Sequence, residues 1–245
     1  MTLIFGHRGA AGSFPENTML SFDEAIQAGA HGIELDVQMT KDGVIVVIHD
    51  ETVDRTTNGK GFIKDLDYKE ITMLDASHSF LQFSGKVRIP TLEEVLEWSV
   101  ANPSILVNIE LKNGIVEYPE LEEKTIKLVT KYKLEDKVIL SSFNHYSLVK
   151  CRSISDEIKT AILFMEGLYK PWEYAQNIGA QGLHPYFYAA KSSLIKEAQS
   201  FGIDVRPFTV NDPSVMRQMF SDQVAAIITD YPERALKLYN EYKKE

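Results

Sequence analysis

The chain has 245 residues, of which 44% are hydrophobic and 25% charged, so it is long enough for a globular domain with a sizeable core. A formal net charge of −9, with no run of lysines or arginines, argues against a nucleic-acid partner. Cys151 is the only cysteine, and no segment resembles a signal peptide or a membrane span, so we expect a cytoplasmic protein without stable membrane insertion.

Short apolar runs alternate with helix-like segments along most of the chain. The runs that predict strands are Leu3–His7, Gly32–Val37, Ile105–Leu111, Val138–Ser141, Thr160–Phe164, Gln181–His184, Asp204–Thr209 and Ala225–Thr229. The segments that predict helices are Thr18–Ala28, Leu92–Val100, Tyr118–Tyr132, Tyr146–Ile154, Trp172–Ile178, Ser192–Phe201, Pro213–Phe220 and Pro232–Tyr242. Eight strand–helix units in a chain of this length predict an α/β fold of the TIM (β/α)8 barrel type. An open doubly wound sheet is the alternative, although the chain lacks a glycine-rich nucleotide-binding motif.

One apolar run breaks this alternation. Val44–His49 follows the run that ends at Met39 after only Thr40-Lys41-Asp42-Gly43. A parallel neighbour would need a crossover of about a dozen residues or more, so the two runs are expected to form an antiparallel hairpin. The Asp-Gly pair suits a tight turn, and the hairpin would bring His49 back toward the end of the preceding strand. The sequence leaves the register of this pairing open.

A long segment, from Asp50 to Arg88, separates this hairpin from the next predicted helix. It contains a short helical pattern at Tyr68–Leu74. Connections longer than about 12–15 residues in compact domains are usually functional. We therefore expect one domain over residues 1–245 with an insertion subdomain at about residues 50–88. A subdomain without a functional role is the alternative.

Carboxylates follow one another on two predicted strands. Glu34 and Asp36 are two residues apart on one strand and so point to the same face, and Glu110 and Lys112 repeat this spacing on the next. The active sites of barrels lie at the carboxyl ends of their strands. Charges that point into a barrel are costly unless they are paired, and three oxygen ligands suit a hard divalent cation. The alternative is an internal salt-bridge network in which nearby basic residues neutralise the acids.

Basic and titratable residues lie at the same strand ends. A divalent cation held by three carboxylates would leave one negative charge, which Arg8 and Lys112 convert into one positive charge that matches a phosphodiester monoanion. Histidine as a residue type titrates near neutral pH, so two histidines, His7 and His49, could share the roles of general acid and general base. His184, which ends a later strand, could also face the pocket.

Three polar residues next to these positions are expected to have structural roles. Asn17 and Thr18 precede the first predicted helix and are expected to cap it. Asp50 follows His49 directly and is expected to be a turn or loop residue and not a metal ligand.

The chain also carries short motifs in a characteristic order. These are His7-Arg8-Gly9, Pro15-Glu16-Asn17-Thr18, Glu34-Leu35-Asp36-Val37, Thr40-Lys41-Asp42-Gly43, Val47-Ile48-His49-Asp50, Asn108-Ile109-Glu110-Leu111-Lys112, Ser142-Phe143, Thr209-Val210-Asn211 and Ile228-Thr229-Asp230-Tyr231-Pro232. In this order, and over nearly the whole chain, the sequence resembles the glycerophosphodiester phosphodiesterase family.

The resemblance implies a TIM barrel with a small insertion after the second strand, and a phosphoric diester hydrolase of lipid and glycerol metabolism. Such an enzyme would cleave glycerophosphodiesters to glycerol 3-phosphate and an alcohol, through a cyclic phosphate formed by the glycerol 2-hydroxyl. By resemblance, His7 and His49 would be the acid and base, and Arg8 and Lys112 would bind phosphate. The residues that would hold one divalent cation, Ca²⁺ or Mg²⁺ with Mn²⁺ also possible, are Glu34, Asp36 and Glu110.

The sequence departs from the family at one position. The family commonly has tryptophan before the Thr-Val-Asn segment, where this chain has Phe208. A phenyl ring could still form an apolar wall against the glycerol carbons of a substrate, but it lacks the indole N–H. This difference bears on substrate preference more than on the chemistry. The alternative role for Phe208 is that of a core aromatic residue.

Two other functions remain open at this point. One is a non-catalytic barrel that binds phosphorylated ligands. The other is an enzyme for lysophospholipids, which would need an apolar patch at the rim of the barrel. The candidate residues for that patch, which could instead pack the insertion onto the barrel, are Phe62, Leu81, Phe83, Tyr186, Phe187 and Tyr188. A small-molecule glycerophosphodiester is the expected partner, and the sequence does not choose between a monomer and a homodimer.

Overall fold

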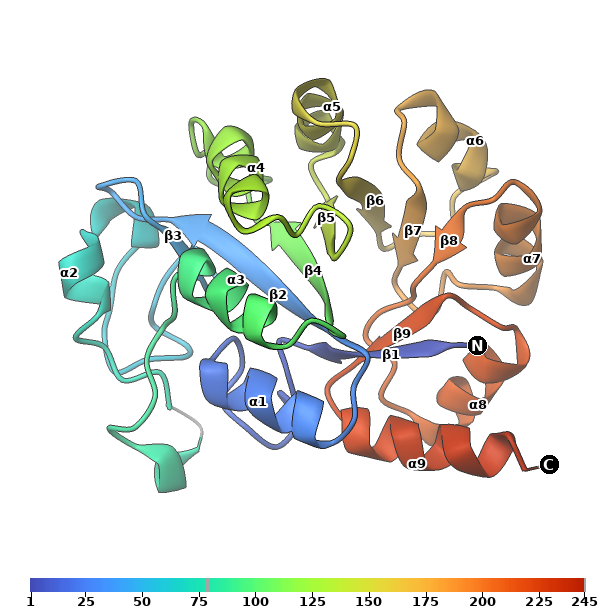
Figure 1. Cartoon of the computed structure of the whole chain (residues 1–245), viewed down its shortest axis with the longest axis horizontal. Helices are drawn as coiled ribbons and strands as arrows, with labels where there is room; N and C mark the ends of the chain where they lie inside the picture. The colour runs from blue at the N-terminus through green and yellow to red at the C-terminus, as the bar shows by residue number, and fades with distance from the viewer. Residues whose placement is uncertain (78–79, 245) are drawn as a thin grey trace.

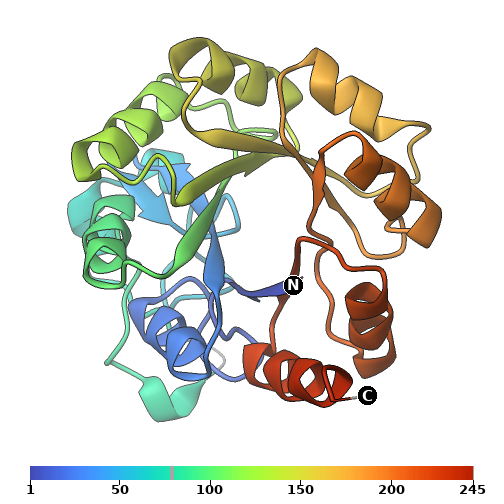
Figure 2. The same ribbon diagram turned by 45° about the vertical axis from the view of Figure 1, so that its right-hand side comes forward.

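The computed structural model describes residues 1–77 and 80–244. Within these residues, eight parallel strands form a nearly closed barrel, and helices surround it (Figures 1 and 2). The parallel strands are β1 (Leu3–His7), β2 (Gly32–Met39), β4 (Leu106–Leu111), β5 (Val138–Ser142), β6 (Lys159–Phe164), β7 (Gly182–Pro185), β8 (Asp204–Val205) and β9 (Ala226–Thr229). The principal helices are α1 (Met19–Gln27), α3 (Leu92–Ala101), α4 (Leu121–Tyr132), α5 (His145–Ile154), α6 (Pro171–Asn177), α7 (Ser192–Ser200), α8 (Pro213–Ser221) and α9 (Pro232–Tyr242).

The order of the strands confirms the predicted TIM barrel. The sheet runs β8-β7-β6-β5-β4-β2-β1-β9, with parallel pairing between the strands along this path. Backbone hydrogen bonds then join its two ends, because the Ile228 N–H donates to the Pro207 carbonyl at 3.0 Å and the Val210 N–H donates to the Ile228 carbonyl at 2.8 Å. An open sheet would leave these edges apart, so that alternative is wrong.

Strand β8 is shorter than the predicted strand Asp204–Thr209. Regular pairing ends at Val205, shortly before Pro207, which has no N–H to donate. The segment nevertheless continues beside β7. The Phe208 N–H donates to the Pro185 carbonyl at 3.0 Å, which keeps Phe208 at the carboxyl end of the barrel.

The predicted hairpin is present. Strand β3 (Ile45–Val47) pairs antiparallel with β2, with Val37 opposite Val47, and this fixes the register that the sequence left open. Gly43 adopts a φ of 82° in the turn, where glycine avoids the strain of a side chain. The pairing continues one step further, because the Ile48 N–H donates to the Asp36 carbonyl at 2.9 Å. His49 therefore follows at the level of the β2 carboxylates.

The segment after β3 forms a small unit beside the hairpin (Figure 1). It contains the short helix α2 (Tyr68–Ile71) and two 3-10 turns at Ile63–Asp65 and Leu81–Phe83. Helix α2 ends earlier than the predicted Tyr68–Leu74, and Asp67 and Glu70 form a capping box at its start. The unit has a buried cluster of its own, which consists of Val46, Ile48, Val53, Ile63, Ile71, Ala76 and Ile89.

Apolar side chains fill both sides of the barrel wall. The barrel interior is packed below the site by Phe5, Ile139, Ala161, Ala226 and Ile228. Two larger clusters lie mainly between the strands and the outer helices. In the part of the chain that the structure describes, no helix combines the length and apolar character needed to span a membrane.

Candidate active site

Three buried carboxylates converge at the carboxyl end of the barrel. Glu34, Asp36 and Glu110 are 3%, 1% and 8% exposed, and each offers an oxygen such that all three atoms lie within 4.8 Å of one another. Parallel pairing of β2 with β4 places Asp36 directly opposite Glu110. The intervening residues of β2 point outward into the core between strands and helices, as the two-residue period of a strand predicts. The structure thus brings the predicted metal ligands together.

The electrostatics of this group fit a cation. Burial raises the pKa of Glu34 well above its ordinary value, and the charges of Asp36 and Glu110 raise it further. Burial, together with Asp36, raises the pKa of Glu110 to about 7. Burial also acts to raise the pKa of Asp36, but the charges of Arg8, His49 and Lys112 and the hydrogen bond from Asn17 together outweigh it and lower that pKa. One buried oxygen, Asp36 Oδ1, has no hydrogen-bond partner among the described residues, as expected of an atom that ligates a metal.

The turn after β1 carries Arg8 into the site. Arg8 adopts a φ of 51° and Gly9 a φ of 86°, so both lie in the left-handed region. A Cβ on Gly9 would lie 2.4 Å from Ser21 Oγ of α1, so only glycine allows the turn to pack this closely. The backbone N–H of Arg8 donates to Glu34 Oε2 at 3.1 Å. The strained conformation of Arg8 is typical of a functional site.

Arg8 and Lys112 flank the carboxylates from opposite sides. Arg8 Nε lies 3.1 Å from Asp36 Oδ2, and its Nη1 donates to Glu16 Oε1 at 2.9 Å. Lys112 Nζ donates to Glu110 Oε1 at 2.9 Å. Both cations therefore lie where a phosphate above the carboxylates could reach them. The same contacts also pair each basic residue with an acid, as the salt-bridge alternative expects.

His7 is held by an aspartate from the neighbouring strand end. Its Nδ1 lies 2.6 Å from Asp230 Oδ1, and its Nε2 lies 3.8 Å from Glu34 Oε2. Asn211 donates to Asp230 Oδ2 at 2.6 Å and accepts from the Asp230 N–H at 3.0 Å, which fixes the carboxylate. With the Nδ1 proton shared with Asp230, Nε2 is the ring nitrogen that faces the carboxylate cluster.

His49 repeats this arrangement across the site. Its Nδ1 lies 2.7 Å from Asp50 Oδ1, and its Nε2 lies 3.2 Å from Lys112 Nζ. Burial lowers the pKa of His49, and the charges of Arg8 and Lys112 add to this effect against the opposing charge of Asp36. In a neutral His49 that donates its Nδ1–H to Asp50, the Nε2 lone pair faces Lys112 Nζ at the site.

Several contributing residues were not assigned by sequence reasoning. Asp50 was expected to be only a loop residue, whereas it contacts the imidazole of His49. Asn17 was expected to cap α1, but its amide donates to Asp36 Oδ2 at 2.9 Å, and Thr18 alone accepts from the Ser21 N–H. Asp230 belonged to a motif without a role. Its place at the end of β9, next to β1, was the available signal.

His184 and Phe208 come from later strands of the barrel, His184 from β7 and Phe208 from the segment after β8. His184 is fully buried in the barrel, and within the described residues neither ring nitrogen has a hydrogen-bond partner. Burial, with the charge of Arg206, lowers its pKa well below the ordinary value. Phe208 is partly buried at the rim, where its ring meets Phe143 and Tyr186 edge-on at centroid distances of 6.0 and 6.1 Å. Substrate binding by His184 or Phe208 stays a prediction.

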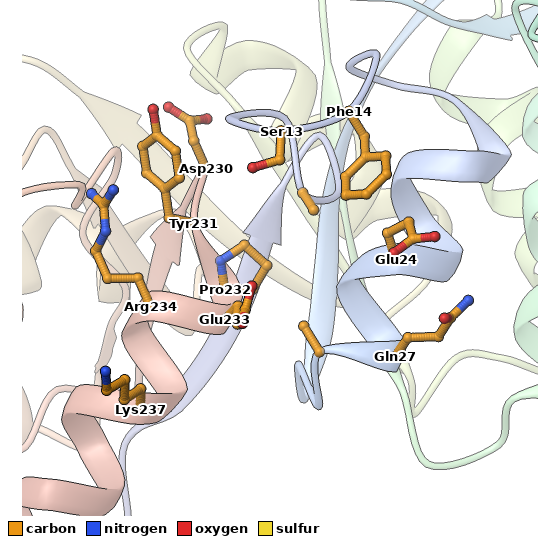
Figure 3. Close-up of a pocket in the computed structure, with 12 residues that line it drawn as sticks. Ser13, Phe14, Glu24, Gln27, Asp230, Tyr231, Pro232, Glu233, Arg234 and Lys237 are labelled. Atoms are coloured by element: carbon orange, nitrogen blue, oxygen red, sulfur yellow. The ribbon is translucent and has the colours of Figure 1, made fainter. Parts of the chain in front are cut away.

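Two cavities open beside the site. One, of about 570 Å³, is lined by Glu110, Lys112 and Phe143 among others. The other, of about 790 Å³, lies beside Asp230, between the loop after β1 and the start of α9 (Figure 3). In the second cavity the Arg234 guanidinium stacks over the Tyr231 ring at 4.1 Å. The first cavity therefore includes two of the charged residues of the site, whereas the second reaches the site only at Asp230.

Comparisons with known proteins show the family to which the chain belongs. The model of the glycerophosphoryl diester phosphodiesterase family matches residues 7–234. A glycerophosphodiester phosphodiesterase of Bacillus altitudinis is 45% identical over 245 residues, which cover 99% of this chain and 100% of the relative. Another, of Caldanaerobacter subterraneus subsp. tengcongensis, is 46% identical over 237 residues, with 97% of each chain covered.

A solved structure shows the same fold. An Oleispira antarctica phosphodiesterase, determined in complex with the product sn-glycerol-3-phosphate, matches with a TM-score of 0.86 at 28% identity, over 98% of this chain and 97% of that chain. The family match extends over most of the sequence and includes all seven charged or titratable residues assigned above to metal, phosphate and proton transfer. On this evidence, the chain is an enzyme of the glycerophosphoryl diester phosphodiesterase family.

Proposed function

We propose that this enzyme hydrolyses glycerophosphodiesters to glycerol 3-phosphate and an alcohol, with a divalent cation and two histidines as acid and base. The observation that carries the proposal is the pair of histidine–aspartate contacts, His7 with Asp230 and His49 with Asp50, which turn both Nε2 atoms toward one buried carboxylate cluster. The glycerol 3-phosphate bound by the similar Oleispira antarctica enzyme supports the choice of product.

The ligands of the cation would be Glu34, Asp36 and Glu110. Their carboxylate oxygens suit Ca²⁺ or Mg²⁺, and Mn²⁺ would accept the same ligands. Once bound, the cation would supply positive charge to the phosphoryl oxygens of the substrate. Its positive charge would also offset the effects that raise the pKa values of Glu34 and Glu110, which are burial first and the repulsion of neighbouring carboxylates second.

The remaining residues would orient the substrate and move its protons. Arg8 and Lys112 would bind the phosphodiester oxygens. One histidine would take the proton of the glycerol 2-hydroxyl as that oxygen attacks phosphorus, and the other would protonate the departing alkoxide. The resulting cyclic phosphate would be opened by water, with the two histidines in exchanged roles, to give glycerol 3-phosphate. Phe208 would form an apolar wall near the glycerol carbons, and His184 would lie beneath the substrate.

The roles of the histidines are tested by His7→Asn and His49→Asn. Each change should lower kcat by about 10²–10⁴-fold, because each removes one proton carrier. Calorimetric titration with Mg²⁺ or Ca²⁺ should show cation binding close to that of the unaltered enzyme. His31→Asn is the matched control, because His31 precedes β2 at the opposite end of the barrel. Wild-type kcat in both site variants would contradict the assignment.

The two alternatives make different predictions. A binding protein would take up the cation without turnover of any glycerophosphodiester. A lysophospholipid enzyme would need its six candidate apolar residues in one patch. Three of them, Tyr186, Phe187 and Tyr188, contact one another after β7, whereas Phe83 contacts Phe14 with ring centroids 5.7 Å apart. Because these contacts lie in different parts of the barrel rim, glycerophosphodiesters are the substrates we propose.

A further inference from the structure

Arg55, in the insertion after β3, lies between two acidic residues of the site. Its Nε and Nη2 donate to the two carboxylate oxygens of Asp50 at 2.7 and 3.0 Å. Its Nη1 and Nη2 donate to the two carboxylate oxygens of Glu16 at 2.8 and 2.7 Å. The planar guanidinium thus makes a forked contact with each acid, a geometry that a lysine side chain has too few fixed donors to reproduce.

The two acids hold different parts of the reacting machinery. Asp50 contacts Nδ1 of His49, and Glu16 accepts a hydrogen bond from Nη1 of Arg8 at 2.9 Å. Arg55 therefore joins the orientation of a proposed acid or base to the orientation of a proposed phosphate ligand. Without its charge, the Glu16 and Asp50 carboxylates would lose their shared cation, and each would be free to turn away from the residue that it holds.

The backbone on either side of Arg55 is fixed. Val53 is fully buried in the apolar cluster of the insertion, and Thr57 is also buried. The Thr57 hydroxyl donates to the Val53 carbonyl at 2.7 Å and accepts from the Gly59 N–H at 2.9 Å. Because both flanks of the turn are tied down, the Arg55 side chain is presented at a defined position and not from a freely moving loop.

We propose that Arg55 is a positioning residue that aligns His49 and Arg8 at the same time, through Asp50 and Glu16. The proposal rests on the hydrolysis proposed above. In this proposal, the insertion contributes to the site by placing the guanidinium of Arg55 next to Asp50 and Glu16. Arg55 is 47% exposed, and exposed ion pairs contribute little to folding stability, so its removal should affect activity far more than unfolding.

The first test separates kcat from KM on glycerophosphocholine. Asp50→Asn should mainly lower kcat, because it loosens His49, and Glu16→Gln should mainly raise KM, because it loosens Arg8. Arg55→Ala should do both and lower kcat/KM by about 10- to 100-fold, as expected when the partner of a site residue is lost. In the Asp50→Asn/Glu16→Gln background, Arg55→Ala should have little additional effect, because both contacts are already weakened.

The second test restores the missing group. Millimolar guanidinium should restore part of the activity that Arg55→Ala loses. The Arg55→Lys variant should also be less active than the unaltered enzyme, because lysine cannot make both forked contacts. Arg88→Ala is the matched control. Arg88 also lies in the insertion, is similarly exposed at 49%, and pairs with Glu94, away from the site. That variant should keep wild-type kcat and KM and show no response to guanidinium.

Three outcomes would overturn the inference while leaving the proposed function intact. The first is wild-type kcat and KM in Arg55→Ala, and the second is full activity in Arg55→Lys. The third is an activity loss in Arg55→Ala that guanidinium does not restore, together with a larger fall in Tm than Arg88→Ala shows. A lack of turnover by the unaltered enzyme on every glycerophosphodiester would instead contradict the proposed function, and with it the role of Arg55.

Discussion

The site uses the same pairing twice, once on each side of the carboxylate cluster. In each case an aspartate meets Nδ1 of a histidine, Asp230 with His7 and Asp50 with His49. Such a contact sets the tautomer, so that Nε2 is directed at the cluster, and it stabilises the ring when it becomes protonated. Two histidines prepared in this way can exchange acid and base roles between two halves of a reaction.

Asp230→Asn tests the pairing of Asp230 with His7, two residues that lie far apart in the sequence. The amide keeps the shape of the carboxylate but cannot stabilise a protonated His7, so kcat should fall by about 10- to 100-fold with KM nearly unchanged. Asp222→Asn is a suitable control, because the Asp222 carboxylate likewise accepts a side-chain hydrogen bond, from the Ser192 hydroxyl at 2.8 Å, away from the site. Steady-state kinetics would refute the pairing if kcat of Asp230→Asn equalled that of the control.

His184 should make stability depend on pH. Burial lowers its pKa well below 6.5 in the folded state, whereas the unfolded chain binds this proton at about 6.5. As the pH falls below about 6.5 the unfolded state gains a proton that the folded state does not. The free energy of unfolding should therefore fall, by up to about 1.4 kcal/mol per pH unit from this group.

Urea unfolding of the native chain and of His184→Leu between pH 7.5 and 5 would measure this contribution. Both pH limits lie about one unit or more from the ordinary histidine pKa. The variant should lose part of the pH-dependent slope, whatever its stability at pH 7.5. An identical slope in both proteins would show that His184 does not bind its proton differently in the two states.

At this scale the sequence predicted the identity of residues better than their contacts. The period of two along a strand was enough to place Glu34 and Asp36 on one face, and the structure confirms that Glu110 joins them. The pairing of His7 with Asp230 joins residues from opposite ends of the chain, and no local pattern contains it. Asn17 shows the same limit, because a residue beside a helix start resembles a cap whichever way its side chain turns.

Individual elements matter because each delivers one group to the rim of the barrel. The turn after β1 presents Arg8, the β2–β3 hairpin returns His49, and the loop after β9 presents Asp230. The turn after β1 depends on a close approach of its backbone to that of a helix. In the first turn, this approach is made by Gly9 against α1.

Gly9→Ala should therefore damage both stability and activity. The new methyl group would meet the backbone of Ser21 at 2.6 Å, in addition to the cost of a positive φ, so the free energy of unfolding should fall by well over about 1 kcal/mol. Gly202→Ala is the matched control, because Gly202 has a φ of 72° with no atom within 4 Å of an added Cβ. Equal losses in urea unfolding would show that the contact with α1 is unimportant.

Elements that follow a local period were predicted well from the sequence, and interrupted ones were not. The helix predicted at Pro232–Tyr242 is present with the same limits, because proline at its start and a steady apolar face define it. Strand β8 ends early at Val205 although the apolar run continues, since Pro207 removes a backbone donor. The register of the hairpin depends on the pairing with β2 and could not be predicted from the turn alone.

The molecule as a whole is negatively charged, but two of its basic side chains lie at the site. The chain carries a net charge of −9, yet Arg8 and Lys112 stand directly beside the three carboxylates. A divalent cation held there would bring the charge of these five residues from −1 to +1, which favours an anionic diester beside them. We further propose that residues 1–245 act as one domain and that the insertion, at about residues 50–88, belongs to the site through Arg55. A cytoplasmic location and the choice between monomer and homodimer stay predictions.

The fold as a whole could be predicted because the strand–helix unit repeats eight times, and one short strand does not obscure this repeat. The number of units favoured a closed barrel over an open sheet, but the hydrogen bonds that close it, between segments around Pro207 and Ile228, follow from no local pattern. The identity of the metal and the preferred alcohol are not specified by the sequence for a different reason. Carboxylate oxygens bind several divalent cations, and the residues that line a cavity are compatible with more than one alcohol group.

The most direct test of the account is glycerol 3-phosphate release by the full chain from glycerophosphocholine and glycerophosphoethanolamine. The enzyme is first treated with a chelator, and Ca²⁺, Mg²⁺ or Mn²⁺ is then restored one at a time. We predict that release stops with the chelator and returns with at least one cation, because the carboxylate cluster needs a bound charge to act on a phosphodiester. Release that is insensitive to the chelator, or cation binding with no release from either substrate, would contradict the account.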